Sequence, residues 1–214
     1  MPEVASKKES VKEEVSKVGS SVKAGVINSL KGMNEIGVKA GVINSLKIMN
    51  EIEAEIVSLV RDTVSNAVRA TGSVANDGVE IAKDVVRSSI QATEEVGTGL
   101  ILSTKHVAKG VVMGVGDVGG DVVKVASQTV IATVKGAAEI GADVGLVARR
   151  AVDGVIEAAK ETGKNVNEVA NSAVGGAIEA AGTIGNSAVK AVKEMLVGVV
   201  EGVKEVASTA LPKK

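Results

Sequence analysis

The chain has 214 residues, of which 45% are hydrophobic, but it contains no phenylalanine, tyrosine, tryptophan or cysteine. Aromatic side chains normally supply much of the burial in a compact core, so this composition argues against an enzyme fold, and the lack of cysteine excludes disulfides and thiolate metal sites. The 25 basic and 26 acidic residues nearly cancel, so the chain lacks the basic surface typical of nucleic-acid-binding proteins.

The first segment, residues 1–21, is rich in charged side chains, and we expect it to be a solvated, partly frayed lead-in. It has no apolar stretch typical of a secretory signal. No part of the chain approaches the ~18 uncharged apolar residues that a membrane-spanning helix needs. We therefore expect a cytoplasmic protein, or one bound peripherally to a membrane or another lipid surface.

Residues 22–53 contain a tandem duplication, in which VKAGVINSLKGMNEIG is followed by VKAGVINSLKIMNEIE. The repeat length of 16 residues rotates a helix by about 160° beyond whole turns. One continuous helix would therefore place the two copies on nearly opposite faces. We expect this region to be helical, either with a turn near Gly37 or with different neighbours for the two copies.

Residues 54–211 form an array of eleven-residue repeats, which runs without insertion or deletion from Ser73 to Lys204. Eleven residues complete about three helical turns, so each repeat position keeps its direction along a helix. A strand would instead reverse its faces at every repeat. The array predicts an all-α protein built from a long amphipathic helix or several helices, and residues 212–214 are a short tail.

Six neighbouring positions of the repeat hold mainly Val, Ile, Ala and Gly and cover about half of the helix circumference. This face is wider than the stripe of a coiled coil or of a bundle helix. We expect it to meet an extended lipid surface or several helices at once, without a compact globular core. The predicted contact residues are Val74, Val79, Val85, Ile90, Val96, Ile101, Val107, Val112, Val118, Val123, Val134, Ile140, Ile156, Ile178, Ile184, Val189 and Val200.

The opposite arc of the helix is charged. Basic side chains at the edge of an amphipathic helix extend toward lipid headgroups when the apolar face is buried in a lipid surface. The residues predicted to lie beside headgroups are Lys83, Lys105, Arg149, Lys160, Lys193 and Lys204.

Glycine recurs every second repeat, which sets a longer period of 22 residues, at Gly97, Gly119, Gly141, Gly163 and Gly185. Two residues after the last four stand possible helix N-caps, namely Asp121, Asp143, Asn165 and Ser187. Two arrangements remain open: a long helix bent at the glycines, or short antiparallel helices joined there. The first is favoured, because Glu139 and Glu161 would otherwise lie at helix C-termini, where the helix dipole disfavours an anion.

The array has a poor intrinsic helix propensity. Each interior glycine costs ~1 kcal/mol relative to alanine, whereas burial of two or three Val or Ile side chains per repeat returns roughly 3–6 kcal/mol once a partner covers them. We therefore expect folding to be coupled to binding or assembly, and the isolated monomer to be poorly helical.

The sequence offers little chemistry. Gly114, Gly116 and Gly119 match the pattern G-x-G-x-x-G, but no strand is predicted before them, so a nucleotide site is not expected. His106, the single histidine, is expected to be an exposed bystander. Paired acidic residues fall on the charged arc as solvated side chains. We expect no catalytic, cofactor or metal site, and neither a small-molecule substrate nor nucleic acid as a partner.

Three segments, KGVVMGV at 109–115, DGVIEAAK at 153–160 and EGVKEVA at 201–207, resemble the eleven-residue units of the synucleins. The array is also similar to the 11- and 22-residue amphipathic repeats of exchangeable apolipoproteins and perilipins, whose helices lie along lipid surfaces. The resemblance implies a non-enzymatic protein that coats or organises a lipid surface and also self-assembles. The alternatives are a protein-only scaffold, as a bundle, tube or filament, and a desiccation-protective protein.

Overall fold

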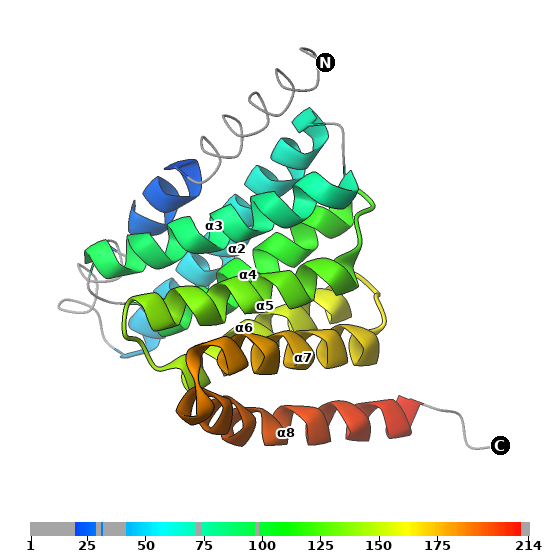
Figure 1. Ribbon diagram of the computed structural model, residues 1–214. Coiled ribbons are helices and arrows are strands. Elements are labelled where there is room, and N and C mark those ends of the chain that lie inside the picture. The colour runs from blue at the N-terminus through cyan, green and yellow to red at the C-terminus, as the bar shows by residue number, and fades with distance from the viewer. Residues whose placement is uncertain (1–19, 29–30, 32–41, 72–73, 97–98, 211–214) are drawn as a thin grey trace, which may run out of the picture.

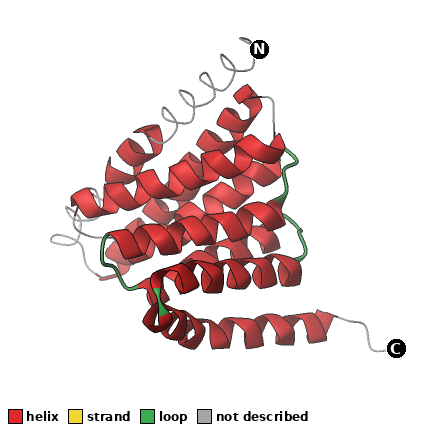
Figure 2. Cartoon of the chain, in the orientation of Figure 1, coloured by secondary structure: helices red, strands yellow, loops and turns green. Residues whose placement is uncertain are grey.

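The computed structural model describes residues 20–28, 31, 42–71, 74–96 and 99–210, and every regular element in these ranges is an α-helix (Figures 1 and 2). The prediction of an all-α protein is confirmed. A helical segment at residues 20–28 precedes the labelled helices. These are α2 (Val42–Thr71), α3 (Val74–Val96), α4 (Leu100–Asp117), α5 (Val122–Glu139), α6 (Val144–Glu161), α7 (Val166–Ile184) and α8 (Asn186–Ala210).

The helices stack in two layers. In one layer α4 packs between α2 and α6, and in the other α5 packs between α3 and α7; the second layer lies in front in Figure 1. Consecutive helices also contact each other across the layers. The last helix, α8, packs on both α6 and α7 and closes the end of the stack.

Three of the predicted glycines reverse the chain. Gly119, Gly141 and Gly163 have φ of +76°, +70° and +67°, the left-handed conformation that glycine adopts without steric cost at a helix C-terminus. Gly120 N donates to Val115 O at 2.9 Å, and the same bond recurs in the next two turns, from Ala142 to Ala137 and from Lys164 to Ala159. The favoured arrangement, one long bent helix, is therefore wrong, and the antiparallel alternative is correct.

Each of these turns is followed by a capped helix. Asp121, Asp143 and Asn165 are the N-caps of α5, α6 and α7, and their side chains accept hydrogen bonds from the backbone N–H three residues later. The objection from the helix dipole does not hold, because Glu139 and Glu161 are exposed and water screens them. Glu161 in addition lies 2.7 Å from Lys109 Nζ.

The fourth turn differs. Gly185 has φ of +145°, and α8 begins at the next residue, so Ser187 lies inside the helix instead of capping it. Gly97, and the turn expected near Gly37, lie outside the described residues.

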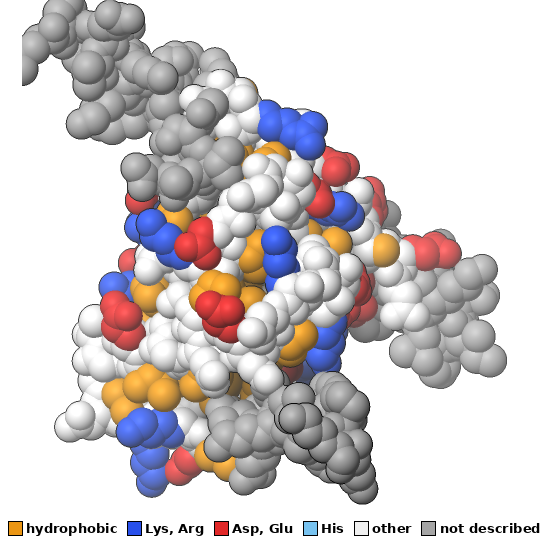
Figure 3. All heavy atoms as spheres, turned by 90° about the vertical axis from the view of Figure 1, so that its right-hand side faces the viewer, with side chains coloured by type: hydrophobic (Ala, Val, Ile, Leu, Met, Phe, Trp, Pro, Cys, Tyr) orange, Lys and Arg blue, Asp and Glu red, His pale blue; other side chains and the backbone are white. Residues whose placement is uncertain are grey.

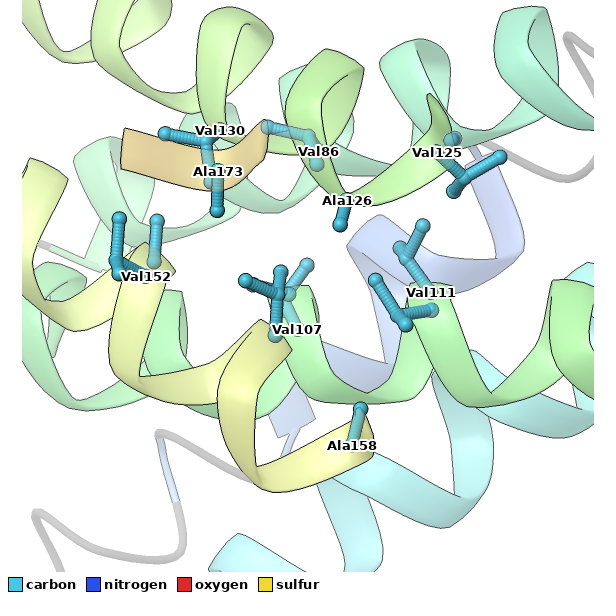
Figure 4. Packing of buried hydrophobic residues seen from close by; sticks show 14 of the residues in the cluster. Val86, Val107, Val111, Val125, Ala126, Val130, Val152, Ala158 and Ala173 are labelled. Carbon is cyan, nitrogen blue, oxygen red and sulfur yellow. The ribbon is translucent and has the colours of Figure 1, made fainter. Parts of the chain in front are cut away.

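The expectation that the chain has no compact core is wrong. Side chains from five helices point into a shared interior, as Figure 4 shows for Val86, Val107, Val130, Val152 and Ala173. The reason is geometric: a helix in a two-layer stack contacts neighbours beside it and across from it, so a half-circumference apolar face is covered by its own chain. The monomer therefore supplies the cover that was expected from a partner.

Glycines allow same-layer helices to approach closely. A β-carbon on Gly110 of α4 would lie 2.8 Å from Val60 Cβ of α2, and one on Gly114 would lie 2.6 Å from the Arg61 carbonyl oxygen. A β-carbon on Gly154 of α6 would overlap the Lys105 carbonyl oxygen of α4. Backbone cannot yield as a flexible side chain can, so these positions require glycine.

We predict that Gly154→Ala lowers the free energy of unfolding by about 1–3 kcal/mol, because the methyl group forces α6 away from α4. Gly175→Ala is the matched control, since Gly175 is an exposed glycine of α7 and a β-carbon there would meet no atom of another helix within 4 Å. The control should raise stability by about 0.5–1 kcal/mol through helix propensity. Urea denaturation monitored by circular dichroism measures both, and equal effects at the two positions would contradict the packing.

Candidate functional site

A polar groove of about 430 Å³ lies over α4, between α2 and α6. Its floor includes Lys105, His106 and Lys109 of α4, which lie within about one turn and on the face opposite the buried Val107 and Val111. The walls come from α2 and α6, through Glu53, Arg61, Glu157 and Glu161 among others. The groove gathers both signs of charge at the meeting point of three helices.

Two lysines tie α4 to α6. Lys105 Nζ lies 2.6 Å from Glu157 Oε2, and Lys109 Nζ lies 2.8 Å from Glu157 Oε1 and 2.7 Å from Glu161 Oε1. The Lys109 side chain is only 12% exposed. Burial lowers its pKa, but the hydrogen bonds to Glu157 and Glu161 outweigh burial, and the net pKa is raised. Lys109 is therefore fully charged at neutral pH.

Glu157 forms ion pairs with both Lys105 and Lys109. Burial raises its pKa, but the hydrogen bonds and charges of Lys105 and Lys109 outweigh burial and lower the pKa to about 2. The carboxylate is ionised over the physiological range and cannot act as a general acid there. Its role in this geometry is to bridge two amines of the neighbouring helix.

Arg61 ties α2 to the C-terminal end of α4. Its Nε lies 2.5 Å from Asp117 Oδ2 and its Nη2 lies 2.9 Å from Asp117 Oδ1, a bidentate pair. A carboxylate at a helix C-terminus is unfavourable for the helix dipole, and the guanidinium compensates for it. The groove thus follows one pattern, in which basic residues of one helix pair with acidic residues of the next helix in the layer.

His106 is not an exposed bystander, as the sequence had suggested. His106 is only 7% exposed, and its Nε2 lies 3.4 Å from Glu53 Oε2 of α2. The pKa of His106 is lowered to about 4, because burial disfavours the imidazolium and Lys105 repels it, despite the nearby carboxylates. The error arose because a repeat position that is polar on average here faces α2, which the period alone cannot reveal.

Ion pairs in the groove join α4 to α2 and to α6. Among the described residues, no group of three or more His, Cys, Asp or Glu side chains is placed to hold a metal ion. Gly114 and Gly119 of the G-x-G-x-x-G pattern have packing and turn roles, since Gly114 lies against the α2 backbone and Gly119 ends α4. Within the described ranges, every helix is too short or too polar to cross a bilayer.

The predicted apolar face is largely internal. Its buried members are Val79, Val85, Ile90, Val107, Val112, Val134 and Ile156, and its half-buried members are Val118, Val123, Ile140, Ile178 and Val189. Ile101 and Ile184 are 38% and 41% exposed. The side chains of Val74, Val96 and Val200 lie outside those described.

The basic residues expected beside headgroups do not form one row. Lys83 pairs with Glu80 at 3.0 Å, and Lys105 lies in the groove. Arg149 pairs with Asp153 and donates to the carbonyl oxygen of Met195 at 3.2 Å. Lys160 and Lys193 are exposed, and the Lys204 side chain lies outside those described.

Of the four exposed large apolar side chains among the described residues, Ile101 belongs to α4 and the other three belong to α7 or α8. Met195 and Val197 of α8 are 40% and 57% exposed, and Ile184 ends α7 shortly before them in sequence. Neither Met195 nor Val197 is among the contact residues predicted from the sequence. Among the described helices, α8 packs only on α6 and α7, whereas α4 has neighbours on both sides in its layer.

No protein-family model matches the chain, and a search of curated proteins finds no similar sequence. The resemblance to lipid-surface repeat proteins therefore rests on repeat period and small-residue composition alone.

We predict that Lys109→Met, which keeps the apolar stem and removes the charge, lowers the free energy of unfolding by about 1–2 kcal/mol, because Glu157 and Glu161 lose a buried donor. Lys190→Met is the control, since Lys190 is 79% exposed and its Nζ lies 3.9 Å from Glu194 Oε1. The control should change stability by less than about 0.5 kcal/mol. Urea denaturation at low and high salt measures both, and a Lys109 effect no larger than the control would contradict a structural role for the groove.

Proposed function

We propose that this protein is a non-enzymatic amphipathic helical protein that binds a lipid surface by releasing α8 from the end of its bundle. The observation that carries the proposal is the position of the exposed large apolar side chains among the described residues. Four such side chains are exposed, and three of them, Ile184, Met195 and Val197, belong to α7 or α8.

The physical basis is the equivalence of a protein core and a lipid acyl region for aliphatic side chains. The inner face of α8 buries Val192, Leu196 and Val199 against the bundle. Water cannot replace that contact, because exposing each of these side chains costs about 1.5–3 kcal/mol. A lipid surface can replace it, and it also covers the 40% exposed Met195, which lies within about 100° of these three side chains around the helix.

The charges of α8 suit the same role. Lys190 and Lys193 are exposed on this helix, and a helix lying at a lipid surface can extend such side chains toward the headgroups. Elsewhere, the face in Figure 3 shows acidic and basic side chains interspersed, with apolar groups between them. Anionic headgroups are therefore expected to assist binding modestly, and burial of apolar side chains to supply most of the affinity.

A disulfide that locks α8 onto α6 tests the proposal. A β-carbon on Gly145 would lie 3.3 Å from Ala191 Cβ, near the roughly 3.5–4.5 Å of a disulfide. The chain has no cysteine of its own, so Gly145→Cys with Ala191→Cys introduces the only pair. We predict that the reduced variant and the wild type float with phosphatidylcholine–phosphatidylglycerol vesicles, and that the oxidised variant loses at least about tenfold in binding.

The reduced variant is the control for the two substitutions themselves. Circular dichroism without lipid should be the same for the oxidised and reduced forms, which shows that the lock does not distort the fold. If wild type does not bind these vesicles at any lipid concentration, lipid binding is wrong. If the oxidised and reduced forms bind equally, release of α8 is wrong.

A protein-only scaffold is the second candidate, favoured by the same end of the stack, because an uncovered apolar helix can also meet another copy. Met195→Lys separates the two, since it places a charge at a 40% exposed side chain beside the inner face of α8. A scaffold predicts self-association in lipid-free buffer by analytical ultracentrifugation, lost in the variant. The lipid proposal predicts a monomer for both proteins and weaker vesicle binding for the variant.

A further inference from the structure

We propose that the cluster around His106 in the groove is an acid-sensitive clasp, which holds α4 against α2 and α6 at neutral pH and loosens this layer when His106 becomes protonated. The inference concerns the fold of the free chain and does not depend on lipid binding.

The surroundings of His106 disfavour a charged imidazole ring. His106 is 7% exposed and its Nε2 lies 3.4 Å from Glu53 Oε2 on α2. An imidazolium there would gain the Glu53 carboxylate as a partner, but it would be buried and would lie beside Lys105 and Lys109 of its own helix, so the charged ring is disfavoured unless it gains water. The charged groups lining the groove around it are Glu53, Arg61 and Asp62 on α2, Lys105 and Lys109 on α4, and Glu157 and Glu161 on α6.

Only 7% of His106 is exposed to the groove, so water can surround a charged ring only if α4 moves away from α2. That movement is costly in the neutral form, because Gly110 and Gly114 bring the α4 backbone into close contact with Val60 and Arg61 of α2. Close packing has a narrow optimum, so a small separation loses contacts along the whole pair of helices. Protonation of His106 therefore loosens the packing of α4 against α2.

The pH window follows from the sign of the shift. The pKa of His106 is about 4 in the folded chain and 6.5 ordinarily. Above pH 6.5 both folded and unfolded chains carry a neutral ring, so stability is complete. As pH falls from 6.5 to 4 the unfolded chain binds a proton that the folded chain refuses, so stability decreases, and below 4 this loss is complete.

Glu157 adds a second stage at lower pH. Its pKa is about 2 in the folded chain and 4.5 ordinarily, so the stability it contributes is lost as pH falls from 4.5 to 2. Between about pH 6.5 and 5 the histidine acts nearly alone, because it is the single histidine of the chain and ordinary carboxylates titrate lower.

Urea unfolding at pH 7.5 and pH 5.0 tests the clasp. For wild type we expect the unfolding equilibrium constant to rise ~30-fold between the two pH values. His106→Gln is neutral throughout and of similar size, and its constant should change by less than about threefold over the same range. Glu157→Gln is the matched control within the groove: it should be less stable at both pH values yet keep the ~30-fold dependence of wild type.

A second measurement does not rely on any variant folding well. The single histidine gives one imidazole signal in the proton NMR spectrum of wild type. We expect that signal to remain in its neutral position from pH 7.5 down to about pH 5 in the folded protein. Titration near pH 6.5 in the folded chain, or a wild-type pH dependence that His106→Gln retains, would overturn the clasp.

Discussion

Close contact between small aliphatic faces of neighbouring helices is the interaction on which this structure depends. Without aromatic side chains, each helix buries only valine, alanine, isoleucine and a few larger residues. Such side chains reach little distance from the helix axis, so they make good contacts only when backbones approach closely. Gly110 and Gly154 permit that approach between α2 and α4 and between α4 and α6. The wide apolar face and the glycine content are therefore two parts of one packing solution.

The groove is a consequence of the same packing. When backbones lie close together, long polar side chains at the edge of the apolar face are brought within reach of the next helix. Lys109 meets Glu157 and Glu161 in this way, and Arg61 meets Asp117. His106 is enclosed because its side chain faces Glu53 of α2. Charged groups that a free helix would direct into water instead set the register of one layer.

The C-terminal end lacks this reciprocal cover. The turn at Gly185 has a different backbone conformation from the three before it, and α8 closes the stack instead of continuing it. A terminal element has fewer neighbours, so it opens at a lower free energy than the interior of a stack. The exposed Met195 and Val197 mark the place where the repetitive packing stops. Under the proposed function, a lipid surface supplies the missing apolar contact.

The sequence by itself determined the local structure. Its eleven-residue period predicts helices, and glycines followed by Asp121, Asp143 and Asn165 mark three of the helix boundaries. Only the tertiary structure decided that the chain reverses at those glycines, that the apolar faces cover one another, and that His106 is buried. The physical reason is that a period specifies the direction of a side chain around its own helix axis. Burial and pKa depend instead on what lies opposite, and that is set by contacts between helices distant in sequence, such as the groove pairs 48, 52 and 56 positions apart.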